Sequence, residues 1–172
     1  MYANQYSLGG YYTGLAGWEF SIEGYYKQMR HILEYQDGVS FFGTSTNWEE
    51  KVEMGEGRSF GLEMMVQKTL GKTTGWLAYT LAKTDHRFKD GAISQGKWFP
   101  YKYDRRHTIS LCLNHKFSER IDVGASWIFN TGGCITVPER ETIIIRPEGN
   151  IESAPYISRR NNYRLPASHR LN

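Results

Sequence analysis

The stretch "GLEMMVQKTLGKTTGWLAYTLA", residues 61–82, decides the fold. In each half of it every second residue is a large apolar one: Leu62, Met64, Val66, Leu77, Tyr79 and Leu81. Alternation with a period of two is the mark of a strand with one dry face and one wet face. The glycine-containing gap between the halves suits a turn. The stretch therefore predicts a β-hairpin whose apolar side chains share one face.

The same alternation recurs along the chain on both sides of this hairpin. We place strands at residues 6–13, 18–28, 58–68, 74–83, 107–117 and 121–130, with a seventh beginning near residue 163. The composition agrees, because 15% of the residues are aromatic and 18 are glycine, a mixture that favours strands and tight turns. We expect an all-β chain with an antiparallel up-and-down sheet of about seven strands.

The connections between these strands alternate between short and long. The short ones are residues 14–17, 69–73 and 118–120, and the long ones are 29–57, 84–106 and 131–162. Several loops beyond about 15 residues are uncommon in compact soluble domains. Strict alternation puts all the long loops at one end of the sheet, which is typical of outer-membrane β-barrels. Strands of about 10 residues also cross a bilayer core when tilted by about 45°.

The side chains at the strand ends and on the polar face are compatible with two environments for the sheet, a membrane and the core of a soluble protein. Aromatic residues gather near the predicted strand ends, as in the girdles of such barrels. They are Tyr25, Tyr26, Trp76, Tyr79, Tyr101, Tyr103, Trp127 and Phe129. Aromatic residues are, however, common in strands of all kinds. Small polar residues on the other face suit a barrel lumen or the exposed face of a soluble sandwich. Periodicity alone does not separate lipid from a protein core. A mean hydropathy of −0.57 fits either, because half of each strand and the loops would face water.

Composition excludes several other classes of protein. The 172 residues suit one domain, and a net charge of +3 is too small to indicate a nucleic-acid partner. The chain holds no run of about 20 apolar residues, and its N-terminus does not resemble a signal peptide. Cys112 and Cys134 are expected to lie more than about 20 Å apart, so we predict no disulfide. Both ends suggest a piece of a longer protein.

Four segments carry a resemblance to a known family. They are "SIEGYYKQM" (21–29), "GRSFGLEMMVQKTLGKTTGWLAYTLAKTDHRF" (57–88), "GKWFPYKYDRRHTISLCLNHKFSERIDVGASWIFNTGG" (96–133, followed by Thr136-Val137-Pro138) and "NNYRLPASHRLN" (161–172). In this order they resemble the barrel of TonB-dependent outer-membrane receptors, in the form common among Bacteroidetes. The resemblance covers about residues 18–172.

The resemblance implies a transport function. Members of that family have a 22-stranded barrel around an N-terminal plug domain and import scarce nutrients such as metal chelates, cobalamin or oligosaccharides, with energy delivered through TonB. No plug, TonB-contacting motif or closing strands are recognisable here. We therefore expect residues 1–172 to be part of the barrel domain of a multi-pass protein of the Gram-negative outer membrane. Its partners would be outer-membrane lipid, the plug, the remaining strands and, through the missing N-terminal part, TonB.

Two other interpretations remain. A soluble β-sandwich that binds a ligand would bury the apolar face against a second sheet. An outer-membrane porin or adhesin would lack the plug. Under the receptor hypothesis the isolated segment would neither insert stably nor transport, because seven strands leave two unpaired edges.

No candidate chemistry stands out, and we expect no enzyme, cofactor or metal. Histidines 31, 86, 107, 115 and 169 have no partner at ligand spacing. The run Asp104-Arg105-Arg106-His107 is expected to form ion pairs at the outer rim. The acidic stretch 49–56 would bind a cation or be a solvated loop. Four aromatics on or beside the long loops would stack on a ligand or pack within the loops: Trp48, Trp98, Phe99 and Tyr101. The ligand-binding residues stay unknown.

Overall fold

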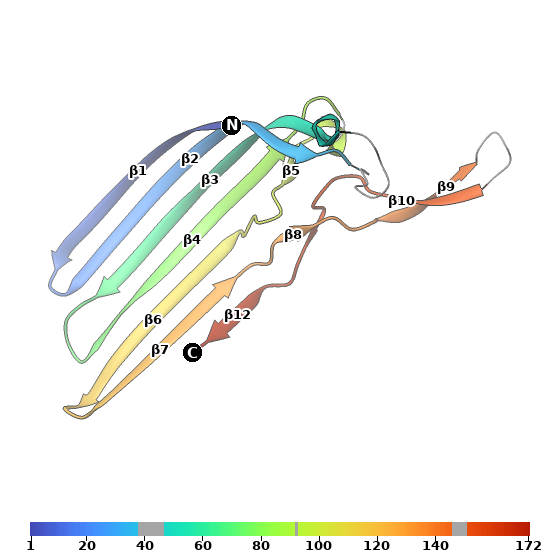
Figure 1. Ribbon diagram of the computed structural model, residues 1–172. Coiled ribbons are helices and arrows are strands. Elements are labelled where there is room, and N and C mark those ends of the chain that lie inside the picture. The colour runs from blue at the N-terminus through green and yellow to red at the C-terminus, as the bar shows by residue number, and fades with distance from the viewer. Residues whose placement is uncertain (38–46, 92, 146–150) are drawn as a thin grey trace.

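The computed structural model describes residues 1–37, 47–91, 93–145 and 151–172, and it is all-β (Figure 1). One antiparallel sheet dominates, and its strands follow each other in chain order from β1 to β12. They are β1 Tyr2–Leu15, β2 Trp18–Tyr35, β3 Val52–Lys68, β4 Thr73–Arg87, β6 His107–Ser118, β7 Ile121–Asn130 and β12 Ser168–Leu171, with β5 Phe99–Pro100 pairing to the end of β4. The sheet is open, and this confirms the predicted up-and-down fold.

The first two long connections are shorter than predicted. Both ends of the segment 29–57 are strand, because β2 continues to Tyr35 and β3 begins at Val52. Likewise β4 continues to Arg87. The alternation of apolar residues ends near residue 28, but backbone pairing persists beyond it, with Arg30 opposite Glu56 and Glu56 opposite Arg87. Charged pairs across neighbouring strands thus replace apolar ones, and the hydrophobic pattern could not reveal them.

The last third of the chain also differs from the prediction. A strand does begin at Tyr163, as predicted, but this strand, β11 (Tyr163–Arg164), pairs with β8 (Cys134–Ile135), and β12 is the strand that joins the sheet. Within the predicted loop 131–162, β9 (Arg140–Ile145) and β10 (Ile151–Tyr156) form a separate hairpin. Pro166 lies between β11 and β12, and its missing N–H suits an interruption of the strand.

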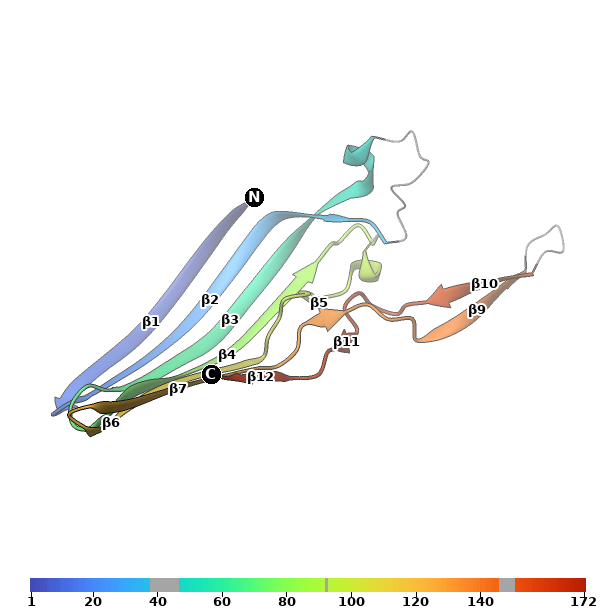
Figure 2. The ribbon, with the colours of Figure 1, turned by 60° about the horizontal axis from the view of Figure 1, so that its bottom comes forward.

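Tight turns and long connections occupy opposite ends of the sheet. The turns β1–β2, β3–β4 and β6–β7 lie together at the lower left of Figure 1. The long connections lie at the other end, and they carry the 3-10 helices η1 (Trp48–Lys51) and η2 (Ser94–Gly96) and the strand β5. Figure 2 shows the β9–β10 hairpin extending beyond the sheet. Among the described residues, no helix is long and apolar enough to cross a membrane.

Register places the alternating apolar side chains on one face, which we call the apolar face. One cross-strand row runs Phe20, Val66, Leu77, Leu111, Trp127 and Leu171, and the next runs Ile22, Met64, Tyr79, Ile109 and Phe129. Within the described residues no second sheet packs on this face, and Leu77 and Val123 remain 43% and 51% exposed. The described residues therefore do not form a two-layer sandwich, which would bury these side chains.

The opposite, polar face carries glutamates, threonines and asparagines. One of its rows is Glu23, Glu63, Thr80, Thr108, Asn130 and Ser168. A small buried cluster of Ile32, Phe88, Ile93 and Phe99, with Met29 against it, lies at the long-connection end. Phe99 pairs with His86 of β4, and His86 shares its row with Met29. This buried cluster of the long connections thus packs against the polar face and leaves the apolar rows open.

Candidate functional site

Polar side chains gather where the three long connections meet. They surround a pocket of about 670 Å³, a volume typical of small-molecule sites. Its lining includes Asp37, Ser94, Gln95, Thr136, Tyr156 and Arg159. These residues come from the connections that follow β2, β4 and β7, so the sheet itself contributes no side chain to the pocket.

Arg160 ties the connection after β7 to the connection after β2. Its Nη2 lies 2.6 Å from Oδ1 of Asp37, and its Nε donates to the same oxygen over 2.8 Å. Nη2 also donates to the carbonyl of Tyr35 at 2.8 Å, and Nη1 lies 3.6 Å from Glu34. Because a guanidinium offers five donors in a planar fork, the single side chain of Arg160 can hold the end of β2 and the residues that follow it.

The connection after β4 joins the same arrangement through Ser94. Oδ2 of Asp37 accepts the backbone N–H of Ser94 at 2.8 Å, and the Ser94 hydroxyl accepts the N–H of Arg160 at the same distance. Ser94 and Gln95 have left-handed backbones with φ of 49° and 54°, and so does Asn161 at 54°. Non-glycine residues adopt this region at a cost, and such residues gather at ligand sites.

Several polar groups and an aromatic ring line the pocket, and two of the hydroxyls are already hydrogen-bonded to neighbouring residues. Arg159 is exposed and makes no ion pair with any residue in the described ranges. Tyr156 presents an aromatic ring with the Arg140 guanidinium 4.2 Å from its centre. Hydroxyls of Thr136 and Ser158 line the same space. A cation, an aromatic ring and hydroxyls suit a ligand that is anionic or rich in hydroxyl groups.

Glu139 supports the wall of this pocket. Its carboxylate accepts hydrogen bonds from the Ser158 hydroxyl and from Nδ2 of Asn162, the latter at 2.8 Å. These two bonds, first that of Ser158, lower the pKa of Glu139 below its usual range. Nδ2 and Oδ1 of Asn162 also bond the backbone of Val137 over 2.9 Å each. The carboxylate therefore stays charged and helps hold the two sides of the connection together.

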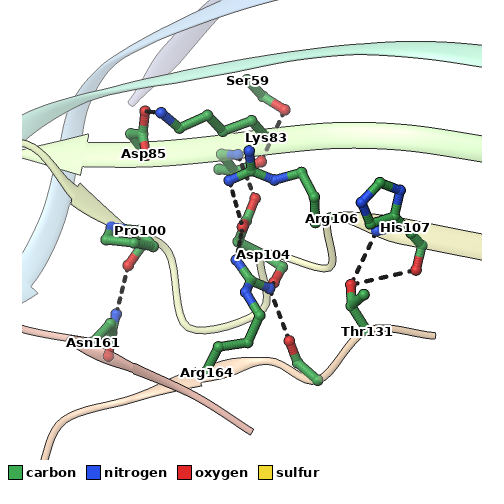
Figure 3. A network of polar contacts seen from close by, with 12 residues as sticks. Ser59, Lys83, Asp85, Pro100, Asp104, Arg106, His107, Thr131, Asn161 and Arg164 are labelled. Atoms are coloured by element: carbon green, nitrogen blue, oxygen red, sulfur yellow. Dashed lines mark hydrogen bonds and ion pairs between the residues drawn. The ribbon is translucent and has the colours of Figure 1, made fainter. Parts of the chain in front are cut away.

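A second polar cluster surrounds Asp104, which is only 3% exposed (Figure 3). Its Oδ1 accepts the backbone N–H of Thr84 at 2.6 Å. Its Oδ2 binds the guanidinium of Arg164 and lies 3.6 Å from Nη2 of Arg106. Arg164 also donates to the carbonyl of Gly132 at 2.8 Å. Asp104 thus joins β4, the start of β6 and β11, which confirms that the Asp104–His107 run forms ion pairs.

The five histidines lie in different places of the sheet and have different neighbours. His107 bonds the hydroxyl of Tyr79 at 2.8 Å, and His115 bonds that of Thr73 at 2.7 Å. His31 lies against Tyr2, and His169 lies in β12. Among the described residues, no three His, Cys, Asp or Glu side chains are grouped to hold a metal ion. Both cysteines are free thiols, and Cys134 is buried.

His86 is the histidine with a distinct environment. It is 8% exposed and stacks on Tyr101 with ring centres 4.5 Å apart. Burial lowers its pKa to about 4, against the opposing influence of Asp85. His86 is therefore neutral at neutral pH and serves as a packing surface for the connection after β4.

The other predicted candidates fall into packing roles. Phe99 is buried beside Phe88, and Trp98 lies between two arginines of the sheet. The acidic stretch 49–56 is not one loop, because Val52 begins β3 and Glu56 pairs with Arg87. The side chain of Trp48 lies outside the described residues, as do residues 38–46 of that predicted loop.

Sequence reasoning missed the residues that build the pocket. Asp37 and Arg160 lie 123 positions apart, and no local spacing joins them. The one available signal is the polar run Arg159-Arg160-Asn161-Asn162 inside a connection. The chain matches no family model, no curated protein and no solved structure in the comparisons made with them.

Proposed function

We propose that this chain is part of the barrel wall of a TonB-dependent outer-membrane receptor that imports a scarce nutrient of the metal-chelate, cobalamin or oligosaccharide class. The observation that carries the proposal is the apolar face, which extends across the sheet from β1 to β12 without a covering layer among the described residues. A surface of this size needs a partner that excludes water. Lipid is the partner that a one-layer sheet with a polar opposite face suits.

The height of the apolar face supports lipid as that partner. From Trp18 to Gln28, eleven residues of β2 span about 34 Å, because they are separated by ten steps of ~3.4 Å. With a strand tilt of about 45°, this corresponds to a band of about 24 Å, close to the apolar band of about 25 Å in such barrels. Trp18 stands at one border with Lys68 over its ring, and Tyr26 and Phe60 stand at the other. Aromatic and basic residues are favoured at these interfaces.

The open edges require further strands. Among the strands that the structure describes, β1 pairs only with β2, and β12 pairs only with β7. Unpaired backbone groups cost several kcal/mol each in lipid, so an open sheet does not span a bilayer. The remaining strands of the receptor would close the barrel, and a plug would lie against the polar face. TonB would act on another part of the receptor. In this proposal the chain performs no catalysis and binds no nucleic acid.

The pocket among the long connections would gather the nutrient from outside. All three connections leave the sheet at the same end, which would be the extracellular end. The Arg159 cation and the Tyr156 ring suit an anionic chelate or a sugar, the nutrient classes of the proposal.

Site-directed spin labelling tests the membrane location. Leu77→Cys and Ala78→Cys are placed singly in a Cys112→Ser, Cys134→Ser background of the complete protein in outer membranes. We expect the label at 77 to be accessible to oxygen and the label at 78 to a water-soluble nickel chelate, because neighbouring strand residues face opposite sides. A label at 77 that neither reagent reaches, in a protein that dissolves without detergent, would support the sandwich instead.

A second experiment separates a receptor from a plug-less porin or adhesin. Growth on a limiting nutrient of each class is compared between cells with and without the gene, and between cells with and without TonB. Uptake that needs both supports the receptor. Uptake that persists without TonB contradicts it.

A further inference from the structure

A group of basic residues borders the apolar face at its long-connection end. We call Arg30, Arg58, Lys83, Arg87 and Lys89 the cationic patch. Register places Lys83 in the row of Tyr26 and Phe60, and Arg58 one row further along. Arg30 and Arg87 lie in the row beyond that, opposite Glu56. The patch therefore begins where the apolar rows end, on the same face of the sheet.

The positive charge of the patch exceeds the negative charge around it. Asp85 lies 3.1 Å from Arg58 and 3.3 Å from Lys83, so one carboxylate serves two cations. Glu56 likewise serves Arg87 and Lys89, the latter at 3.5 Å. Arg30 makes no ion pair with any described residue. Five cations thus face these two carboxylates. Asp90 borders the same region, and the net charge of the region is still positive when Asp90 is included.

Trp98 holds two of these guanidinium groups in place. Its ring lies between Arg58 at 4.3 Å and Arg87 at 4.8 Å. Stacking on an aromatic ring orders each guanidinium, whose Nε and Nη2 donate to a carboxylate: Asp85 for Arg58 and Glu56 for Arg87. Beside it, a pocket of about 470 Å³ is lined by Arg30, Arg87 and Lys89, together with Glu56 and Asp90. The excess positive charge beside this pocket, which includes Arg30 with no ion pair to a described residue, favours the oxygens of a phosphate group.

An apolar groove lies directly next to the patch. It has a volume of about 620 Å³ and lies between the row of Tyr26, Phe60 and Lys83 and the row of Gly24, Leu62 and Leu81. Gly24 creates space there, because a Cβ at this position would meet no atom closer than 4.0 Å. Leu8 of β1 completes the lining. Lys83 lines the groove and also belongs to the patch.

We propose that this part of the apolar face binds one phosphorylated lipid of the surrounding leaflet, with an acyl chain in the groove over Gly24 and its phosphate on the cationic patch. Charge complementarity argues for this occupant, because apolar surface and excess positive charge are continuous at Lys83. Neutral lipids would fill the groove but leave the excess positive charge of the patch uncompensated. The inference rests on the proposed barrel, since it needs this face to meet lipid.

The test measures lipid binding to the complete protein in mild detergent by native mass spectrometry. Three probes are compared: dioleoyl phosphatidic acid, dioleoyl phosphatidylcholine and inorganic phosphate. We expect retention of phosphatidic acid well above phosphatidylcholine. Arg58→Gln with Arg87→Gln should weaken phosphatidic acid binding by about 30-fold, since each basic residue near an anionic surface contributes about fivefold. Gly24→Leu should weaken phosphatidic acid and leave inorganic phosphate unchanged.

Lys68→Gln is the matched control, because Lys68 borders the same apolar face at its other end. We expect it to leave phosphatidic acid binding unchanged, and circular dichroism verifies that each variant is folded. Equal binding of phosphatidic acid to the double variant and to the unaltered protein would overturn the inference. So would an affinity for inorganic phosphate equal to that for phosphatidic acid, because the site would then be a free-anion site. Absence of the protein from outer membranes would instead contradict the proposed barrel.

Discussion

Arg160 and Asp37 are joined by an ion pair of 2.6 Å although they lie 123 positions apart. The pair closes the ring of three long connections around the candidate pocket, because Asp37 also accepts the N–H of Ser94. One guanidinium thus decides whether connections that leave three different strands act as one unit.

The first prediction concerns this pair. Arg160→Ala should destabilise the connection region by about 1–2 kcal/mol, since charge-assisted hydrogen bonds are lost but Asp37 is partly exposed. A double-mutant cycle with Asp37→Ala, read by hydrogen exchange of the Ser94 amide, should give a coupling energy of similar size. Arg159→Ala is the matched control and should leave this exchange unchanged. A coupling energy near zero would show that the two residues do not hold the connections together.

The second prediction concerns Asp104. Asp104→Asn removes a charge that is almost fully buried and leaves Arg164 and Arg106 without their shared carboxylate. We expect a loss of about 3 kcal/mol in the free energy of unfolding, measured by urea titration of the complete protein in lipid vesicles. Asp90→Asn, an exposed neighbour in the same connection, should change it by less than about 0.5 kcal/mol. Similar losses in both variants would exclude a special role for Asp104.

The third prediction concerns pH and His86, which lies beyond the apolar rows. Its pKa is about 4 in the folded protein and about 6.5 when unfolded. Between these values the unfolded state binds more protons, so stability falls as pH is lowered from about 6.5 to about 4 and by up to roughly 3 kcal/mol. His86→Phe keeps a ring against Tyr101 and should remove this part of the pH dependence. An unchanged slope in the variant would contradict the assignment.

The fourth prediction concerns the two faces of the sheet. Leu77→Arg places a charge in the middle of the apolar face and should cost about 2–4 kcal/mol in a lipid bilayer. Thr80→Arg places the same side chain on the polar face, in the row of Glu23 and Glu63, where opposite charges accept it. Folding into lipid vesicles, followed by tryptophan fluorescence, should therefore fail for the first variant far more than for the second. Equal tolerance would exclude lipid as the medium on the apolar face.

The sequence by itself determined the sheet. Period-two alternation predicted six of the seven main strands and the face on which their side chains lie, because this pattern depends only on the geometry of an extended chain. This pattern did not predict the strand residues in which apolar and polar side chains no longer alternate. The extensions of β2, β3 and β4 are held by backbone pairs and by charges such as Glu56 and Arg87. The strand that begins at Tyr163, β11, pairs with β8 instead of joining the main sheet.

Only the tertiary structure decided the sites. The pocket depends on contacts such as Arg160 with Asp37, and the lipid site depends on Gly24, Arg58 and Trp98, which three separate segments bring to the same end of the sheet. The physical reason is that strand periodicity is a local property of neighbouring residues. Ion pairs and stacked rings between distant connections form only after the sheet has brought those connections to one end.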